Sequence, residues 1–188
     1  EGEKRDRLLK TTLDETARLN FLTNNILVAS QLADRGFRSD KTELNLASLL
    51  RDCLRDFQKR FPDRVVIAEI PDEVVLNGDP LLLQILINNL LENAQKYAPR
   101  ETPINLNLTE NGGSIRLEVI DQGPGIPPAE RKRIFNRFYR IENETTRKTQ
   151  GTGLGLYLCK KIAQAHRADI SVTDHAPQGS NFAVEFLA

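Results

Sequence analysis

Cysteine is scarce in this sequence, and long hydrophobic runs are absent from it. Cys53 and Cys159 lie far apart in apolar helical patterns without a CxxC motif or a Cys/His cluster, which argues against a disulfide or a zinc site and fits a reducing compartment. No apolar run approaches the roughly 20 residues that span a bilayer. Basic and acidic residues number 26 each, so no global field attracts polyanions, and we expect no nucleic acid binding and no direct membrane contact.

Glycine and proline are missing from residues 5–35, and this stretch predicts one long α-helix that ends at Gly36. Apolar residues recur in it at spacings of three and four, namely Leu19, Leu22, Ile26, Ala29 and Ala33. The pattern is typical of a helix that pairs with a partner helix, but over about two heptads an amphipathic helix on its own domain gives the same pattern. We predict two units, residues 1–36 and 37–188.

The second unit is long enough for one complete α/β domain. After the polar linker FRSDKTE, helices are predicted over residues 46–60, 80–97 and 154–165, and Asp79 and Pro80 provide an N-cap and a first-turn proline for the second helix. Strands are predicted over residues 65–70, 73–76, 104–110, 114–120, 168–174 and 181–187. The sequence Asn111-Gly112-Gly113 predicts a hairpin turn.

The helix predicted over residues 80–97 carries amides among its leucines. Ile85, Asn89, Asn93 and Lys96 fall on one side of it. A buried amide without a partner costs about 1–3 kcal/mol, so either nearby backbone or a ligand must satisfy this face. A polyphosphate with bound Mg²⁺ fits well, because Mg²⁺ prefers oxygen ligands and takes only one or two of them from the protein. Lys96 would then contact phosphate, or else it is a solvated surface lysine.

Two glycine-rich motifs follow that helix. DQGPGIP, residues 121–127, comes directly after an apolar strand; its glycines would let a flat ligand approach, and Asp121 could accept a hydrogen bond from the amine of adenine, although plain turns have this composition too. GTGLGLYLCK, residues 151–160, opens a helix in the manner of an anion site, but it fits neither the P-loop nor the Rossmann fingerprint.

A basic segment lies between the two motifs. Residues 129–150 hold seven Lys or Arg against three Glu, an excess of four positive charges in a neutral chain. Arg140 could therefore reach a phosphate, while Phe135 and Phe138 hold the segment to the domain. An exposed charged helix with two core aromatics has the same composition.

Taken in their order, the four segments resemble those of the catalytic, ATP-binding domain of sensor histidine kinases, in the superfamily that includes gyrase, Hsp90 and MutL. NNLLENAQKY resembles the N box, DQGPGIP the G1 box, IFNRFYR the F box and GTGLGL the G2 box, and the match covers residues 42–188. The resemblance implies a two-layer α/β fold of helices on a mixed sheet. It also implies that residues 1–36 are the second helix of a dimerisation hairpin.

The resemblance implies a site for ATP and Mg²⁺. It assigns the metal to Asn93 with support from Asn89, and it assigns phosphate contacts and a part in catalysis to Lys96 and Arg140 beside Asn93. Tyr97 would lie beside the base. The residues that would bind the base or shape the site and its lid are Asp121, Gly123, Gly125, Ile126, Gly151, Thr152, Gly153, Leu154, Gly155 and Ser180.

The activity implied is transfer of the ATP γ-phosphoryl group to a histidine, and then to an aspartate of a response regulator receiver domain, in a homodimer formed through the hairpin. The family's acceptor histidine precedes an acidic residue on the first hairpin helix, a context that His166 and His175 lack. We therefore expect this chain to be a piece of a longer protein. The resemblance implies that the parent is a kinase anchored in the bacterial inner membrane, with this part on the cytoplasmic side.

Two other functions stay open. An ATPase of the gyrase or Hsp90 type would be expected to carry a catalytic carboxylate early in the N-box helix, where Gln84 and Asn88 stand. A non-catalytic module that binds nucleotide or only a partner protein would need no acceptor at all.

Overall fold

The computed structural model describes residues 40–141 and 152–187, together with Arg5, Leu9, Thr12, Thr16, Leu19, Thr23, residues 25–28 and Ser30. The chain divides into two compact units, Glu1–Phe37 and Arg38–Ala188. In the first unit every described residue is helical, and the hydroxyls of Thr16 and Thr23 donate to the carbonyls four residues earlier at 2.8 and 2.9 Å. Leu22, Ala29 and Ala33 of the predicted helix-pairing pattern lie outside the described residues.

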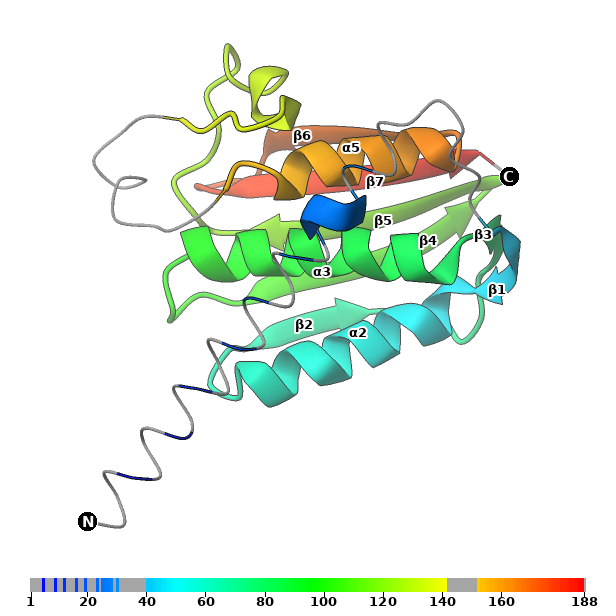
Figure 1. Cartoon of the computed structure of the whole chain (residues 1–188), viewed down its shortest axis with the longest axis horizontal. Coiled ribbons are helices and arrows are strands. Elements are labelled where there is room, and N and C mark those ends of the chain that lie inside the picture. The colour runs from blue at the N-terminus through cyan, green and yellow to red at the C-terminus, as the bar shows by residue number, and fades with distance from the viewer. Residues whose placement is uncertain are drawn as a thin grey trace. The chain divides into compact units, whose positions relative to one another are not determined.

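The second unit is built on a mixed five-stranded sheet with helices over one of its faces (Figure 1). Its strands are β2 (Val66–Glu69), β4 (Ile104–Asn111), β5 (Ser114–Asp121), β6 (Ala168–Asp174) and β7 (Ser180–Leu187), in the order β2-β4-β5-β7-β6. β2 runs parallel to β4, and the other neighbouring strands are antiparallel. The predicted two-layer α/β fold is confirmed.

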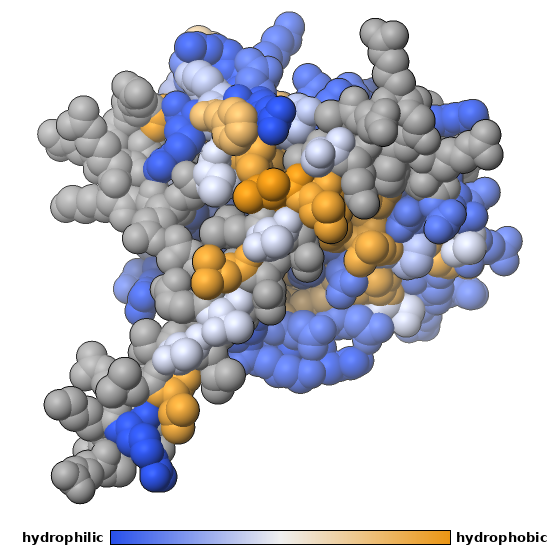
Figure 2. Space-filling model, in the orientation of Figure 1, coloured by the Kyte–Doolittle hydropathy of each residue, from blue (hydrophilic) through white to orange (hydrophobic). Residues whose placement is uncertain are grey.

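Three helices, α2 (Leu46–Arg60), α3 (Pro80–Tyr97) and α5 (Gly155–Ala165), lie side by side on the sheet, and a 3-10 helix, η1 (Arg133–Phe135), follows β5 (Figure 1). Leu50 and Phe57 of α2 and Leu86 of α3 are fully buried, as are alternate residues of the central strands. Hydrophilic residues cover the outer side of α2, along the lower border of this unit in Figure 2. The helices therefore supply the core with one apolar side each.

A second, two-stranded sheet corrects the prediction for two segments. β1 (Thr42–Asn45) pairs antiparallel with β3 (Val75–Gly78), so a strand that was not predicted begins inside the predicted linker, at its last two residues, and the strand predicted over residues 73–76 begins and ends two residues later. The polar sequence TELN has no apolar alternation to indicate a strand. This segment forms a strand only because it pairs with β3, some thirty residues away, and local sequence patterns do not predict such pairing.

Both ends of α3 are fixed by charged side chains. At the N-terminus, Oδ1 of Asp79 accepts from the backbone N–H groups of Leu81 and Leu82, both at 3.1 Å. At the C-terminus, the buried guanidinium of Arg64 donates to the backbone carbonyls of the last turn and the following loop, those of Gln95, Ala98, Pro99 and Thr102. Because these end groups lack partners within the helix, the two residues stabilise α3 at its termini.

The hairpin between β4 and β5 turns at Gly112 and Gly113, whose φ angles are +56° and +83°. A side chain added at either glycine would have no neighbour within 4 Å, so the turn projects into open space. From this turn β5 runs to Asp121 at its far end.

Candidate functional site

The amide side of α3 is divided between a buried and a half-buried asparagine. Asn89 is 5 % exposed, and its Nδ2 donates to the carbonyl of Ile85 at 2.8 Å. Asn93, one turn further on, is half-buried, and its side chain has no hydrogen-bond partner in the part of the chain that the structure describes. Backbone therefore satisfies part of Asn89, whereas the Asn93 amide is available to a ligand.

The start of α5 lies against this side of α3. A Cβ atom added to Gly155 would lie 2.7 Å from Oδ1 of Asn89, so a larger residue there would displace the Asn89 side chain. Leu154, just before it, is buried at 3 % exposure, and Thr152 is exposed. Gly151 lies outside the described residues. The predicted G2 segment thus meets the predicted N-box helix through Asn89.

The last turn of α3 carries two predicted ligand contacts that touch each other. Nζ of Lys96 donates to the hydroxyl of Tyr97 at 2.9 Å and lies 4.5 Å from the centre of that ring. Both side chains are half-buried. The ammonium group is therefore held near the end of the helix, where a phosphate could replace the tyrosine hydroxyl as its partner.

Asp121 is a buried carboxylate held by backbone. It is 3 % exposed, its Oδ1 accepts from the N–H of Gly123 at 2.7 Å, and the N–H of Ser180 also donates to its carboxylate. Burial raises the pKa of Asp121, and the two backbone hydrogen bonds oppose that rise. Ser180 is buried beside it, as the sequence prediction expected of a nearby residue.

Glycines bring three segments together around Asp121. A Cβ atom on Gly123 would lie 3.1 Å from the carbonyl oxygen of Tyr97, and one on Gly125 (φ +75°) would lie 3.4 Å from that of Gly179. Gly179 approaches even more closely, since its Cβ atom would lie 1.9 Å from the Asp121 carbonyl oxygen. Gly179 was not among the predicted site residues; its place directly before Ser180 and the closing strand was the available signal.

Ile126 of the DQGPGIP motif is held by an arginine that the sequence analysis did not single out. Nε of Arg131 donates to the Ile126 carbonyl at 3.1 Å, and Nη2 of the same guanidinium lies 2.6 Å from Oδ1 of Asp174. Arg131 thereby links the loop after β5 to the end of β6.

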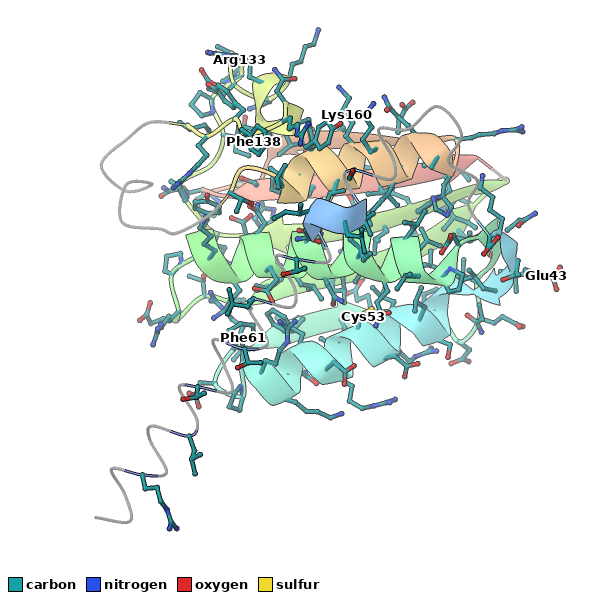
Figure 3. The ribbon with its side chains drawn as sticks, viewed as in Figure 1. Glu43, Cys53, Phe61, Arg133, Phe138 and Lys160 are labelled. Atoms are coloured by element: carbon teal, nitrogen blue, oxygen red, sulfur yellow. The ribbon has the colours of Figure 1, made fainter. Side chains whose placement is uncertain are left out.

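The basic segment between the motifs is folded back on itself before residue 142. The Tyr139 hydroxyl donates to Glu130, and the Arg133 guanidinium lies 4.6 Å from the centre of the Tyr139 ring. Phe138, 61 % exposed at φ +63°, lies above α5 with Arg133 in Figure 3. Arg140 follows Tyr139 and is half-buried. Tyr139 and Glu130 are further residues that the sequence analysis missed.

The two ends of the segment from Phe138 to Gly153 are joined by backbone. The N–H of Phe138 donates to the carbonyl of Gly153 at 3.0 Å. Gly153 has φ +69°, and a Cβ atom there would lie 2.7 Å from the carbonyl carbon of Phe138 and 2.9 Å from the carbonyl oxygen of Tyr139. The predicted F and G2 segments are therefore in direct contact.

Metal ligation by a conventional cluster does not occur in the described residues: none of their His, Cys, Asp or Glu side chains form a group of three or more that could hold an ion. The amide oxygen of Asn93 is a suitable ligand for Mg²⁺ that also binds phosphate oxygens, since such an ion needs few groups from the protein. Among the described helices, none has the length and apolarity required to cross a membrane.

The chain matches a known protein family. Residues 78–188, more than half of the chain, match the family described as histidine kinase-, DNA gyrase B- and HSP90-like ATPase. The chain belongs to this ATPase family.

Curated relatives of this ATPase-family chain are sensor kinases. Sensor histidine kinase CusS of Escherichia coli O157:H7 is 31% identical over 178 residues, which cover 94% of this chain and 37% of CusS. Sensor histidine kinase YkoH of Bacillus subtilis (strain 168) is 29% identical over 189 residues, which cover 98% of this chain and 41% of YkoH. The chain thus spans about two-fifths of the length of these relatives. The predicted family is confirmed.

Solved structures show the same fold. The mycobacterial sensor histidine kinase MprB matches with a TM-score of 0.70 and 27% identity, over 78% of this chain and 97% of that one. The Acinetobacter baumannii histidine kinase AdeS, at 19% identity, matches with a TM-score of 0.73 over 96% of this chain and 83% of its own.

Proposed function

We propose that residues 37–188 form the ATP-binding catalytic domain of a sensor histidine kinase, and that residues 1–36 are the second helix of its dimerisation hairpin. The γ-phosphoryl group of Mg-ATP would pass to a histidine outside this chain and then to an aspartate of a response regulator receiver domain. The observation that carries the proposal is that both glycine motifs contact the amide-bearing helix α3, Gly155 at Asn89 and Gly123 at Tyr97.

Asp121 is the group we assign to the adenine amine. Its carboxylate has two backbone donors that fix its orientation, and acceptor positions remain because an ionised carboxylate offers about four lone-pair sites. Gly123 and Gly125 leave the adjoining backbone without side chains, so a flat base can approach it.

Asn93 is the protein ligand we assign to Mg²⁺, with Asn89 supporting it from the preceding turn. When bound, the ion would supply positive charge that neutralises the phosphates. Lys96, held at Tyr97, and Arg140, directly after the Tyr139–Glu130 contact, would add positive charge along the phosphates. Phosphoryl transfer depends mostly on such positioning and charge neutralisation, so no general base need come from this chain.

The acidic residue of α3 favours a kinase over a gyrase- or HSP90-type ATPase. Glu92 forms an ion pair with Arg60 of α2, and so it is directed to the neighbouring helix. Gln84 and Asn88, early in α3, are amides, and the helix has no other carboxylate. No side chain of α3 is therefore placed to activate a water molecule, which an ATPase of that type requires.

The first test is calorimetric titration of the chain with ATP in the presence and absence of Mg²⁺. Asn93→Ala is expected to abolish the Mg²⁺-dependent part of the affinity while the domain stays folded. Asn88→Ala, on the same helix and also half-buried, serves as the matched control and should bind normally. Normal Mg-ATP affinity in the Asn93 variant would remove the metal assignment.

The second test supplies an acceptor hairpin from a histidine kinase and looks for acid-labile phosphohistidine. Transfer to the hairpin supports the kinase, whereas steady hydrolysis of ATP without any acceptor supports the ATPase. Failure to bind nucleotide at all would leave only a partner-binding module. By similarity to the sensor kinases, we also propose that the parent protein dimerises through the hairpin and is anchored in the inner membrane, with this domain in the cytoplasm.

A further inference from the structure

Helices α3 and α5 are antiparallel neighbours joined at three points. Near the start of α5, Gly155 meets Asn89. In the middle, the thiol of Cys159 donates to the Leu86 carbonyl at 3.7 Å. At the end, Nε2 of His166 accepts from the backbone N–H of Asp79 at 2.9 Å. A shift of α5 along α3 would therefore change all three contacts together, including the one at the amide side of α3.

Among the side chains that make these three contacts, only His166 has an ordinary pKa close to the physiological pH range. It is buried at 7 % exposure, and its other ring nitrogen, Nδ1, lies 2.8 Å from the Ile162 carbonyl. Because Nε2 accepts from a backbone N–H, Nδ1 must carry the proton and donate it. The neutral ring with hydrogen on Nδ1 satisfies both contacts. The protonated ring carries hydrogen on both nitrogens, so it cannot accept the hydrogen bond from the backbone N–H of Asp79.

Asp79, which donates to His166, also contacts α3 and the segment before β1. Besides capping α3 through Oδ1, its Oδ2 accepts from the N–H of Asp40 at 3.2 Å, in the segment that enters β1. Gly78 lies under the imidazole, since a Cβ atom there would be 3.2 Å from Cδ2 of His166. The histidine thus contacts the junction where the entering chain, β3 and α3 meet.

We propose that His166 is a positioning residue for nucleotide binding: its hydrogen bond from Asp79 fixes α5 along α3 and so holds Gly155 against Asn89. This inference rests on the proposed function of the site. His166 lies at the opposite end of α5 from the glycines and touches neither Asn93 nor Asp121, so its effect on ATP passes through the helix.

The charged groups around His166 are Asp79 at the start of α3 and Lys41 just before β1. Burial lowers the pKa of His166, the bond to the Ile162 carbonyl raises it, Lys41 lowers it and Asp79 raises it. Since the folded value lies below the ordinary value of about 6.5, the contribution of the neutral ring to stability is complete above about pH 6.5 and declines as the pH falls below it. ATP affinity should decline at lower pH, where the ring becomes protonated in the folded protein.

The test compares His166→Leu, His166→Gln and the control Gln164→Leu, an exposed position on the same helix, in the full chain. The probe is Mg-ATP, titrated between about pH 5 and about pH 8, and thermal unfolding confirms that each variant is folded at the assay temperature. His166→Leu should bind roughly three- to tenfold more weakly at every pH, the effect of one lost buried hydrogen bond. His166→Gln, whose amide oxygen can accept from Asp79 but cannot be protonated, should bind normally near pH 8 and lose less affinity on acidification than the wild type.

Three results would decide against the proposal. One is normal affinity in folded His166→Leu, and another is an acid dependence in His166→Gln equal to that of the wild type. A loss in Gln164→Leu as large as in His166→Leu would also overturn it, because any change in the last turns of α5 would then have the same effect. Absence of ATP binding by the wild type would contradict the proposed function itself, and it is measured first.

Discussion

Replacement of Asp121 by asparagine should separate recognition of the base from recognition of the phosphates. The carboxylate is buried, with two backbone N–H groups donating to it, and we assign its remaining acceptor capacity to the adenine amine. Asparagine keeps the shape but turns one oxygen into a donor, so either a backbone N–H or the adenine amine loses its acceptor. A hydrogen bond to a charged group contributes about 1.5–3 kcal/mol, so ATP should bind about ten- to a hundredfold more weakly.

The fold should tolerate this change. Burial is the largest influence on the Asp121 carboxyl and raises its pKa, which means that the folded protein disfavours the charge there despite the backbone donors. A neutral amide removes that desolvation cost. We therefore expect only a small loss in the free energy of unfolding, and a reduction in ATP affinity would report on binding and not on folding.

The assay is calorimetric titration of wild type and variant with Mg-ATP and with magnesium tripolyphosphate, which lacks the base. Only ATP affinity should decrease in the variant. Asp169→Asn, an exposed carboxylate on β6, is the matched control and should leave both affinities unchanged. Equal losses for ATP and tripolyphosphate in the Asp121 variant would refute the assignment of this residue to the base.

Three more predictions follow from contacts around the site. Gly153→Ala places a Cβ atom 2.7 Å from the Phe138 backbone and should reduce ATP affinity by roughly tenfold. Gly112→Ala, at positive φ but in open space, should lower the free energy of unfolding by only about 1 kcal/mol, and denaturant titration of both variants would measure the effect on stability. Arg64→Met leaves the carbonyls at the end of α3 unsatisfied and should lower the free energy of unfolding by about 2–4 kcal/mol, against less than about 0.5 for the exposed Arg55→Met; equal losses would contradict the capping role. Because burial raises the pKa of Asp121, ATP affinity should fall on acidification at a pH above the ordinary value of about 3.9, while the contribution of this group to stability changes in the opposite direction and is greatest when it is protonated.

Local chemistry was sufficient to predict most helices and strands of the second unit. The bounds of α2 and α3 follow from end signals such as Asp79-Pro80, and the β4–β5 hairpin follows from its glycine turn and alternating strands. β1 could not be predicted in this way, since four polar residues form a strand only because β3 lies beside them. Helices and strands with their own capping residues and hydrophobic periodicity can therefore be predicted from the sequence, whereas a strand that forms only by pairing with a distant strand cannot.

The site shows the same division. The motifs predicted the residues that we assign to nucleotide binding, among them Asn93 and Asp121, because amides in an apolar helix and a carboxylate before glycines are unusual in a sequence. Contacts between residues that are distant in the sequence were not predicted. Gly179 approaches the Asp121 backbone and Tyr139 donates to Glu130, and no local pattern joins the members of either pair. The role of His166 likewise depends on the register between two helices.

The open turn at Gly112 and Gly113 has a practical consequence. Ser114 and Asp121 are the first and last residues of β5, seven steps apart along the strand, or about 23 Å at the usual rise per residue. A peptide tag or a dye attached through this loop would leave the end of the strand that carries Asp121, the residue we assign to the base, accessible, and exposed loop tips tolerate such insertions well. The domain could thus be tethered to a sensor chip in a single orientation, with its ligand-facing side toward the solution.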